Sequence, residues 1–287
     1  MLEELNRFKT NLEVEGRDPK TIDTYMNYVR KFEEHHVGKS VNEITIDDVN
    51  NFLFTFRDKG DATMNKVKAS LRKYLSFYDK DNLVKKIKLK KLKIKIREIP
   101  TQNEIKEFIK KIPENNLRNL REKTMIIVLY CTGLRVNELA NIKKSNFYSN
   151  KNEVFVPKEI AKMDQERTIV LVENTVFEYL NKYWKRRRDK SEFAFVKKNG
   201  IFFSIKTIEH IINKWWIKSG IEKKLTPQVL RICYNSHNKE NGVPEEIRLR
   251  NMGHTKEINM IHYTYQELKK VKENLKGSLM SDLNEGK

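Results

Sequence analysis

The sequence has few cysteines, no long apolar run and a deficit of negative charge. Its two cysteines among 287 residues, Cys131 and Cys233, are too few for a disulfide framework and lack the spacing of a metal site. No segment approaches the ~20 apolar residues that span a bilayer, and residues 1–7 show no signal-peptide pattern. Glycine-rich phosphate loops, zinc spacings and acidic clusters suited to magnesium are also missing from the sequence. We therefore expect a cytoplasmic protein that uses no membrane, metal or cofactor.

The charge balance points to a polyanionic partner. Fifty-eight Lys and Arg residues against 39 Asp and Glu residues give a formal net charge of +19. Such an excess attracts polyanions through counterion release, so nucleic acid is the first partner to consider. A solvated, lysine-rich surface is the alternative. An apolar fraction of 38% argues against wholesale disorder, and the length indicates two domains.

Residues 1–83 are predicted to form a helical bundle. Asp18-Pro19 supplies a cap and a first-turn proline, and residues 45–48 (Thr-Ile-Asp-Asp) form a capping box. Apolar residues recur at helical spacing after each signal and again between Met64 and Tyr78. Three or four amphipathic helices of this size make a small bundle, with the repeated aromatic residues in its core.

Residues 84–99 form a tract of different composition. Eight of the fifteen residues 84–98 are basic, and from Ile87 much of the tract alternates apolar residues with lysine. Alternation suits an extended segment with one face on protein and the other on an anion. We expect a Lys-rich interdomain linker that lies on a phosphate backbone; a lysine-guarded edge strand is an equal alternative.

Residues 100–287 are predicted to mix helices with a small β-hairpin. Residues 153–157 and 167–172 have the composition of two strands joined by a polar turn. Helical patterns occupy residues 104–112, 121–130, 173–188, 205–218, 226–240 and 243–250, and the tail after Tyr265. The expected fold class is therefore mainly α with a small β-hairpin or sheet, in two domains.

Four stretches in this second region carry the candidate chemistry. The first, residues 131–139, reads Cys-Thr-Gly-Leu-Arg-Val-Asn-Glu-Leu, in which a Thr-Gly turn would present Arg135 to a cleft. The second places Lys162 at the turn between the two strands. The third, residues 226–242, begins Thr-Pro-Gln-Val-Leu-Arg and includes Arg231. In the fourth, Tyr263 follows Gly253-His254 by nine residues.

Together these stretches resemble the tyrosine recombinase (phage integrase) family, and its compact Xer-type members most closely. The family shows T-G-L-R-x-x-E-L, then G-K-G-x-x-R before an apolar strand, then T-P-H-x-L-R, and finally G-H followed by a tyrosine. Residues 1–83 resemble the family's core-binding (SAM-like) domain, so the resemblance covers nearly the whole chain. It implies that residues 100–287 form an α+β catalytic domain with a C-terminal helical tail.

The resemblance also implies a role for each matching residue. Tyrosine can attack phosphorus to form a covalent intermediate, and arginine forks suit phosphate oxygens. A 3′-phosphotyrosine keeps the bond energy, so that a free 5′ hydroxyl can rejoin the strand without ATP or metal. The implied catalytic residues are Arg135 and Arg231 on the phosphate, His254 as a further donor, Lys162 as the acid for the 5′ oxygen and Tyr263 as nucleophile, with Glu138 in support.

Gln228 departs from the family, which has histidine at this position. Glutamine can donate a hydrogen bond to phosphate but cannot accept a proton at neutral pH. Loss of general-base help costs ~10²–10⁴-fold in rate. We expect Gln228 to keep a phosphate contact in a slower enzyme. His237 also matches the family pattern and is expected to be a packing and hydrogen-bonding residue.

The expected function is a site-specific DNA recombinase, acting in DNA integration or in Xer-like dimer resolution. Its partner would be double-stranded DNA with paired recognition arms, bound by a dimer on one site and a homotetramer on two sites. The alternative is a catalytically weak or silent DNA-binding relative with an accessory or regulatory role, which Gln228 alone supports. A third candidate, an RNA-binding protein, lacks an aromatic RNA-binding signature.

Overall fold

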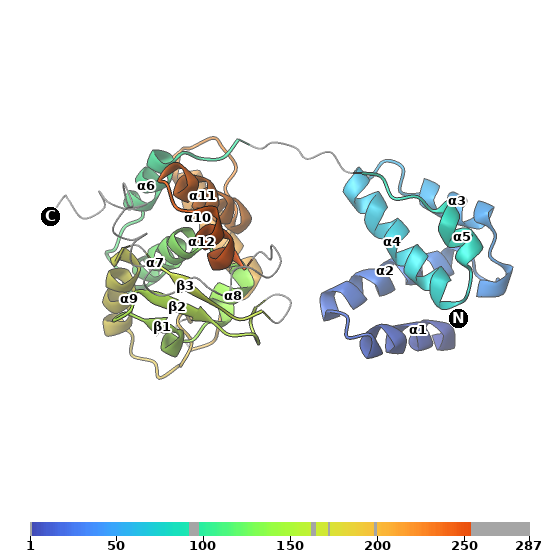
Figure 1. Ribbon diagram of the computed structural model, residues 1–287, viewed down its shortest axis with the longest axis horizontal. Helices are drawn as coiled ribbons and strands as arrows, with labels where there is room; N and C mark the ends of the chain where they lie inside the picture. The colour runs from blue at the N-terminus through green and yellow to red at the C-terminus, as the bar shows by residue number, and fades with distance from the viewer. Residues whose placement is uncertain (1, 92–97, 162–164, 172, 198–199, 254–287) are drawn as a thin grey trace. The chain divides into compact units, whose positions relative to one another are not determined.

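The structure, a computed structural model, describes residues 2–91, 98–161, 165–171, 173–197 and 200–253. The chain divides into two compact units, residues 1–96 and 97–287 (Figure 1). Each unit has its own hydrophobic core. This division falls within the tract 84–99; the domain boundaries inferred from sequence stay a prediction. In the described part of the chain no helix has the length and apolarity needed to cross a membrane.

The N-terminal unit is a bundle of helices, as its sequence predicts. Its helices are α1 (Leu2–Val14), α2 (Pro19–His35), the 3₁₀ turn η1 (Val41–Glu43), α3 (Ile46–Phe54), α4 (Asp61–Phe77) and α5 (Asp81–Lys86). The Asp18 side chain caps α2 by accepting the N–H of Lys20 at 2.9 Å. Thr45 and Asp48 form the predicted capping box of α3. These local signals fix where the helices begin.

Most aromatic residues of this unit lie in its core or pack against it, whereas Phe54 is exposed. Phe8, Phe32 and Tyr74 are fully buried, and the rings of Phe8 and Tyr74 meet edge to face at 5.2 Å. The hydroxyl of Tyr74 donates to the buried carboxylate of Glu33 at 2.7 Å. Burial raises the pKa of Glu33 above its ordinary value, although the Tyr74 bond opposes this shift. The prediction that these aromatic side chains form the core is confirmed.

Residues 87–91 of the Lys-rich tract lie against helix α4. Ile87 is buried in the N-terminal core. The Asn65 side chain pairs with both peptide groups of Lys90, since its amide donates to the carbonyl at 2.6 Å and its oxygen accepts the N–H at 2.9 Å. Lys68 donates to the carbonyl of residue 88 at 3.0 Å. Residues 84–86, which we expected to begin the linker, instead close helix α5.

The C-terminal unit combines helices with a small antiparallel sheet (Figure 1). Its helices are α6 (Gln102–Lys110), α7 (Leu117–Thr132), α8 (Val136–Asn141), η2 (Lys144–Asn146), α9 (Thr175–Arg186), α10 (Ile205–Ser219), α11 (Pro227–Glu240) and α12 (Glu245–Met252). The sheet has the order β1 (Phe147–Tyr148), β2 (Glu153–Val156), β3 (Arg167–Val170). The predicted hairpin is β2–β3, and β1 adds two residues that are too few to show a pattern. The predicted fold class is confirmed.

Helix α7 runs through the core of this unit and ends at a turn that only glycine allows. The helix is buried continuously from Glu122 to Thr132. Gly133 ends it with φ +63°, and a Cβ added there would lie 2.6 Å from a ring carbon of Tyr234. A side chain would therefore meet both a disfavoured backbone conformation and a clash. The turn buries Leu134 and leads the chain directly to Arg135.

Replacing Asn65 with alanine should loosen residues 87–91 without unfolding the bundle. The change removes two hydrogen bonds to Lys90, each contributing about 1 kcal/mol in net terms. We expect trypsin to cut after Lys88 and Lys90 roughly tenfold faster or more, with helix content by circular dichroism unchanged. Asn51→Ala, at an exposed position on α3, is the control. Equal cutting of both variants would show that Asn65 does not hold the tract.

Candidate active site

The C-terminal end of helix α12 gathers three arginines from three different elements. The backbone carbonyls of residues 251, 252 and 253 accept, in that order, from Arg167 at 2.8 Å, from Arg231, and from Arg135 at 3.3 Å. Arg167 begins β3, Arg231 lies in α11, and Arg135 precedes α8. A helix C-terminus carries partial negative charge and unsatisfied carbonyls, so it favours cations. The end of α12 thus orients three guanidinium groups.

The buried carboxylate of Glu138 ties two of these arginines together. Arg167 donates to both of its oxygens, at 2.9 and 2.7 Å. Arg135 donates to it from its side chain at 3.0 Å and from its backbone N–H at 2.7 Å. Burial alone would raise the pKa of Glu138, but the hydrogen bonds and charges of the two arginines outweigh it, so that this pKa lies below its ordinary value. Glu138 is therefore ionised at neutral pH.

Arg231 is buried and its electrostatic environment is strongly positive. Its guanidinium donates to the carbonyls of Gly133 and Met252. Burial, followed by the charge of Arg135, lowers its pKa to about 10, and Glu138 partly offsets this shift. Arg231 therefore remains protonated at neutral pH. Three guanidinium groups and one carboxylate give the cluster a net charge of +2, which favours binding of an anion.

Among these groups Arg135 has the most access to solvent. Its side chain is 25% exposed, against 5% for Arg167 and 1% for Glu138. An incoming anion would thus meet Arg135 first, with the other charges held behind it. In the described part of the chain no group of three or more His, Cys, Asp or Glu side chains is placed to hold a metal ion. The charge of the cluster comes from arginine.

Gln228 lies one helical turn before Arg231. It is exposed in the first turn of α11, whose N-cap Thr226 accepts the N–H of Val229 at 3.2 Å. Positions three apart share a helix face, so Gln228 and Arg231 lie on the same side of α11. His237, further along, is buried between the hydroxyl of Tyr130 at 2.8 Å and a backbone carbonyl, which confirms its packing role.

The structure brings together some of the predicted site residues and does not describe others. Arg135, Glu138 and Arg231 form one cluster, and Gln228 shares a helix face with Arg231. Lys162, His254 and Tyr263 lie outside the described residues, as does the predicted helical tail. Their roles stay predictions.

Two residues of the cluster received no role from the sequence. The sequence showed Arg167 only as a basic residue that opens an apolar strand, one position beyond the arginine of the family's G-K-G-x-x-R motif; the structure shows that it is buried. Asn251 gave no signal. Its side chain donates to the carbonyl of Val170 at 3.2 Å and to the hydroxyl of Tyr234 at 2.9 Å. It thereby fastens α12 to β3 and α11, which sets where the three arginines meet.

Comparison with known proteins identifies relatives over almost the whole chain. The chain is 30% identical over 276 residues to tyrosine recombinase XerA of Pyrococcus furiosus, covering 94% of this chain and 92% of that protein. A lambda integrase dimer bound to a COC' core site matches with a TM-score of 0.70 at 16% identity, covering 95% of each chain. A lambda integrase tetramer bound to a Holliday junction matches with a TM-score of 0.71 at 17% identity, covering 91% of this chain and 80% of that one. These structures share the fold.

Family models match both units. Residues 5–91 match the N-terminal SAM-like domain of phage integrases, and residues 99–270 match the phage integrase family. The family resemblance inferred from the four stretches is therefore confirmed. The chain belongs to the phage integrase family, the family of the tyrosine recombinases.

Proposed function

We propose that this protein is a site-specific DNA recombinase that cuts and rejoins duplex DNA through a covalent 3′-phosphotyrosine. The observation that carries the proposal is the arginine cluster at the end of α12, in which Arg135 and Arg231 are fixed before any ligand binds. Family membership supports recombination as the activity. The covalent route rests on Tyr263 and its spacing from Gly253.

The cluster would act on the charge of the reacting phosphate. As a nucleophile adds to phosphorus, negative charge on the non-bridging oxygens needs compensation, and preorganised donors typically contribute ~2.7–4 kcal/mol each. Arg135 and Arg231 would provide this compensation in place of a metal. Because the phosphotyrosine bond conserves the energy of the cut bond, strand rejoining would need no ATP.

The remaining roles follow the sequence. Tyr263 would be the nucleophile, Lys162 the acid for the leaving 5′ oxygen, and His254 a further donor to the phosphate. His254 is the chain neighbour of Gly253, whose carbonyl accepts from Arg135. Glu138 would hold Arg135 in position, and Arg167 would hold Glu138.

Gln228 is the residue that decides between an active enzyme and a silent DNA-binding relative, because the family has histidine at this position. A side chain on the same face as Arg231 can reach the same phosphate, and an amide can donate to it. The protonated arginines nearby would lower the pKa of Tyr263 and recover part of the lost base help. An intact set of ion pairs around Glu138 favours the active enzyme over the silent relative.

The proposed partner is double-stranded DNA with paired arms, bound by a dimer on one site and a tetramer on two sites. The lambda integrase structures, a dimer on a core site and a tetramer on a Holliday junction, support this assembly. The XerA relative favours a Xer-like resolving role, and integration is the other role of the same chemistry. A cytoplasmic location remains a prediction.

Tyr263→Phe should abolish the covalent DNA adduct and leave duplex binding within about threefold, because only the nucleophilic oxygen is lost. The measurement is a denaturing gel of protein incubated with a nicked, labelled attachment site. Tyr265→Phe is the matched control and should keep the adduct. An adduct that persists in Tyr263→Phe would assign the nucleophile to another residue.

Gln228→His should speed adduct formation by about tenfold or more, since a general base contributes ~10²–10⁴-fold and the wild type retains part of that help. Single-turnover rates on the same nicked site provide the measurement. We expect the wild type to form the adduct slowly. If only the histidine variant forms it, the wild-type chain is a silent relative.

Arg167→Lys should slow single-turnover adduct formation about tenfold at saturating DNA, with duplex affinity within about threefold. Lysine keeps the charge but cannot form the two-point contact with Glu138, so Arg135 would lose its fixed position. A rate and an affinity that fall together would contradict a positioning role, as would an unchanged rate.

A further inference from the structure

Apart from the arginine cluster at the end of α12, the C-terminal unit contains a positively charged cleft, called here the α7 cleft. It has a volume of about 830 Å³ and lies among the N-terminal end of α7, the residues that follow α9, and α10. Its charged lining residues are Arg118, Arg121, Glu122, Arg186, Arg187, Arg188, Asp189 and Lys197. Six cationic side chains and two carboxylates give this lining a formal net charge of +4.

Neither carboxylate is available to a ligand. Asp189 is held by Arg187, whose Nε donates to it at 2.9 Å. Glu122 is 1% exposed and accepts from Arg118 at 3.0 Å, from Lys214 and from Trp215 at 2.6 Å. Burial opposes the ionised form of Glu122, but these donors hold its pKa below its ordinary value. The charged groups left facing the cleft are therefore cationic, and they stand among uncharged lining residues.

Among the cationic groups, Arg121 is held in place by its neighbours, whereas Arg188 and Lys197 are exposed and form the rim of the cleft. Arg121 lies over the ring of Phe203, 4.9 Å from its centroid, and donates to the carbonyl of Val196 at 3.0 Å. These contacts fix the plane of its guanidinium, and its buried Nε has no hydrogen-bond partner. Arg188 and Lys197 are exposed at the rim, and neither forms an ion pair with any described residue.

The position of the cleft favours DNA as the ligand. Asn116 caps α7 at the cleft, and the helix N-terminus adds partial positive charge. The arginine cluster lies beyond the other end of the same helix, at Gly133. From Arg121 to Gly133 the helix rise is roughly 18 Å at about 1.5 Å per residue. Phosphates recur every ~3.4 Å along each DNA strand, so one duplex can reach both places within about a helical turn.

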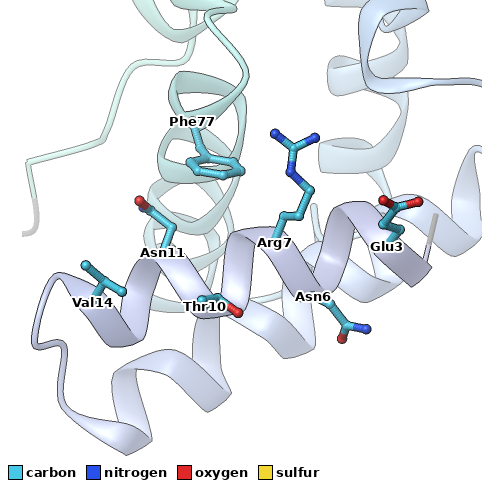
Figure 2. Close-up of a pocket in the computed structure, with 7 residues that line it drawn as sticks. All are labelled: Glu3, Asn6, Arg7, Thr10, Asn11, Val14 and Phe77. Carbon is cyan, nitrogen blue, oxygen red and sulfur yellow. The ribbon is translucent and has the colours of Figure 1, made fainter.

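Another hollow in the structure lacks this charge. It measures about 640 Å³ and follows α1 in the N-terminal unit. Figure 2 shows its lining residues: Glu3, Asn6, Arg7, Thr10, Asn11, Val14 and Phe77. One carboxylate and one guanidinium cancel, so this hollow offers no excess charge to an anion. The α7 cleft differs from this hollow in its excess of arginine and lysine.

We propose that the α7 cleft binds a backbone phosphate of the DNA arm that flanks the cut site. This inference rests on the proposed function and adds a second phosphate site to it. Guanidinium groups bind phosphate oxygens through paired, charge-assisted hydrogen bonds. The cleft would grip the arm while the cluster at the end of α12 acts on the reacting phosphate.

The test compares two double variants of the full chain with equal charge loss. Arg188→Gln with Lys197→Gln alters the rim, and Lys185→Gln with Lys239→Gln alters exposed lysines that do not line the cleft. Duplex binding is measured at graded salt. Each phosphate contact contributes ~0.9 to the slope of log K against log salt. Since the cleft is proposed to hold one phosphate, we expect the rim variant to lower the slope by about 1 and the control variant to leave it unchanged.

Other outcomes overturn the inference in distinguishable ways. If the wild type binds duplex with a steep slope and both double variants match it, the cleft is not a DNA site while the proposed function stands. If the wild type shows no salt-dependent duplex binding, the proposed function itself fails. If a hexaglutamate peptide binds the wild type but not the rim variant, and the DNA slope is unchanged, the cleft binds an acidic protein segment.

Discussion

The buried carboxylate of Glu138 makes the rest of the arginine cluster possible. Three guanidinium groups close together repel one another, and the lowered pKa of Arg231 records part of that repulsion. Glu138 binds two of them, Arg135 and Arg167, through side-chain and backbone donors. Removing one partner of a buried ion pair costs about 3–5 kcal/mol. Because Glu138 holds Arg135 and Arg167, and backbone carbonyls hold Arg231, the positive site exists before an anion arrives, which is what electrostatic catalysis requires.

The cluster also satisfies backbone groups that would otherwise be unpaired. The last carbonyls of a helix have no partner within it, and those at the ends of α7 and α12 are buried beside the arginines. Arg231 donates to both ends, so that one side chain stabilises two helices and fixes its own position. The contacts that stabilise these helix ends are therefore the same contacts that position the arginines of the site. A substitution at Arg231 would disturb both.

Features set by neighbouring residues were predictable from the sequence, and features set by distant contacts were not. The caps at Asp18 and Thr45, the turn before Arg135 and the hairpin are all local. Arg167 gains its meaning from residues 138 and 251, and Asn251 from β3 and α11. The Lys-rich tract is a further example. Its composition is visible in the sequence, but its hydrogen bonds to Asn65 join residues 25 positions apart and were not predictable. The family motifs indicated that Arg135, Glu138 and Arg231 belong to one site, which signals from neighbouring residues do not show.

Helix α7 connects the two positive sites, and its burial fixes the distance between them. Twelve of its residues are buried, so it cannot bend or shift without disturbing the core. In the proposed mode of binding, a phosphate held at its N-terminal end fixes the duplex at a set distance from Arg135. A flexible tether would leave the reacting phosphate free to slide along the cluster. A buried helix would instead hold the duplex in one position along its axis relative to Arg135. Phosphate contacts fix the position of a protein on DNA, and a site-specific enzyme needs that position before it reads any base.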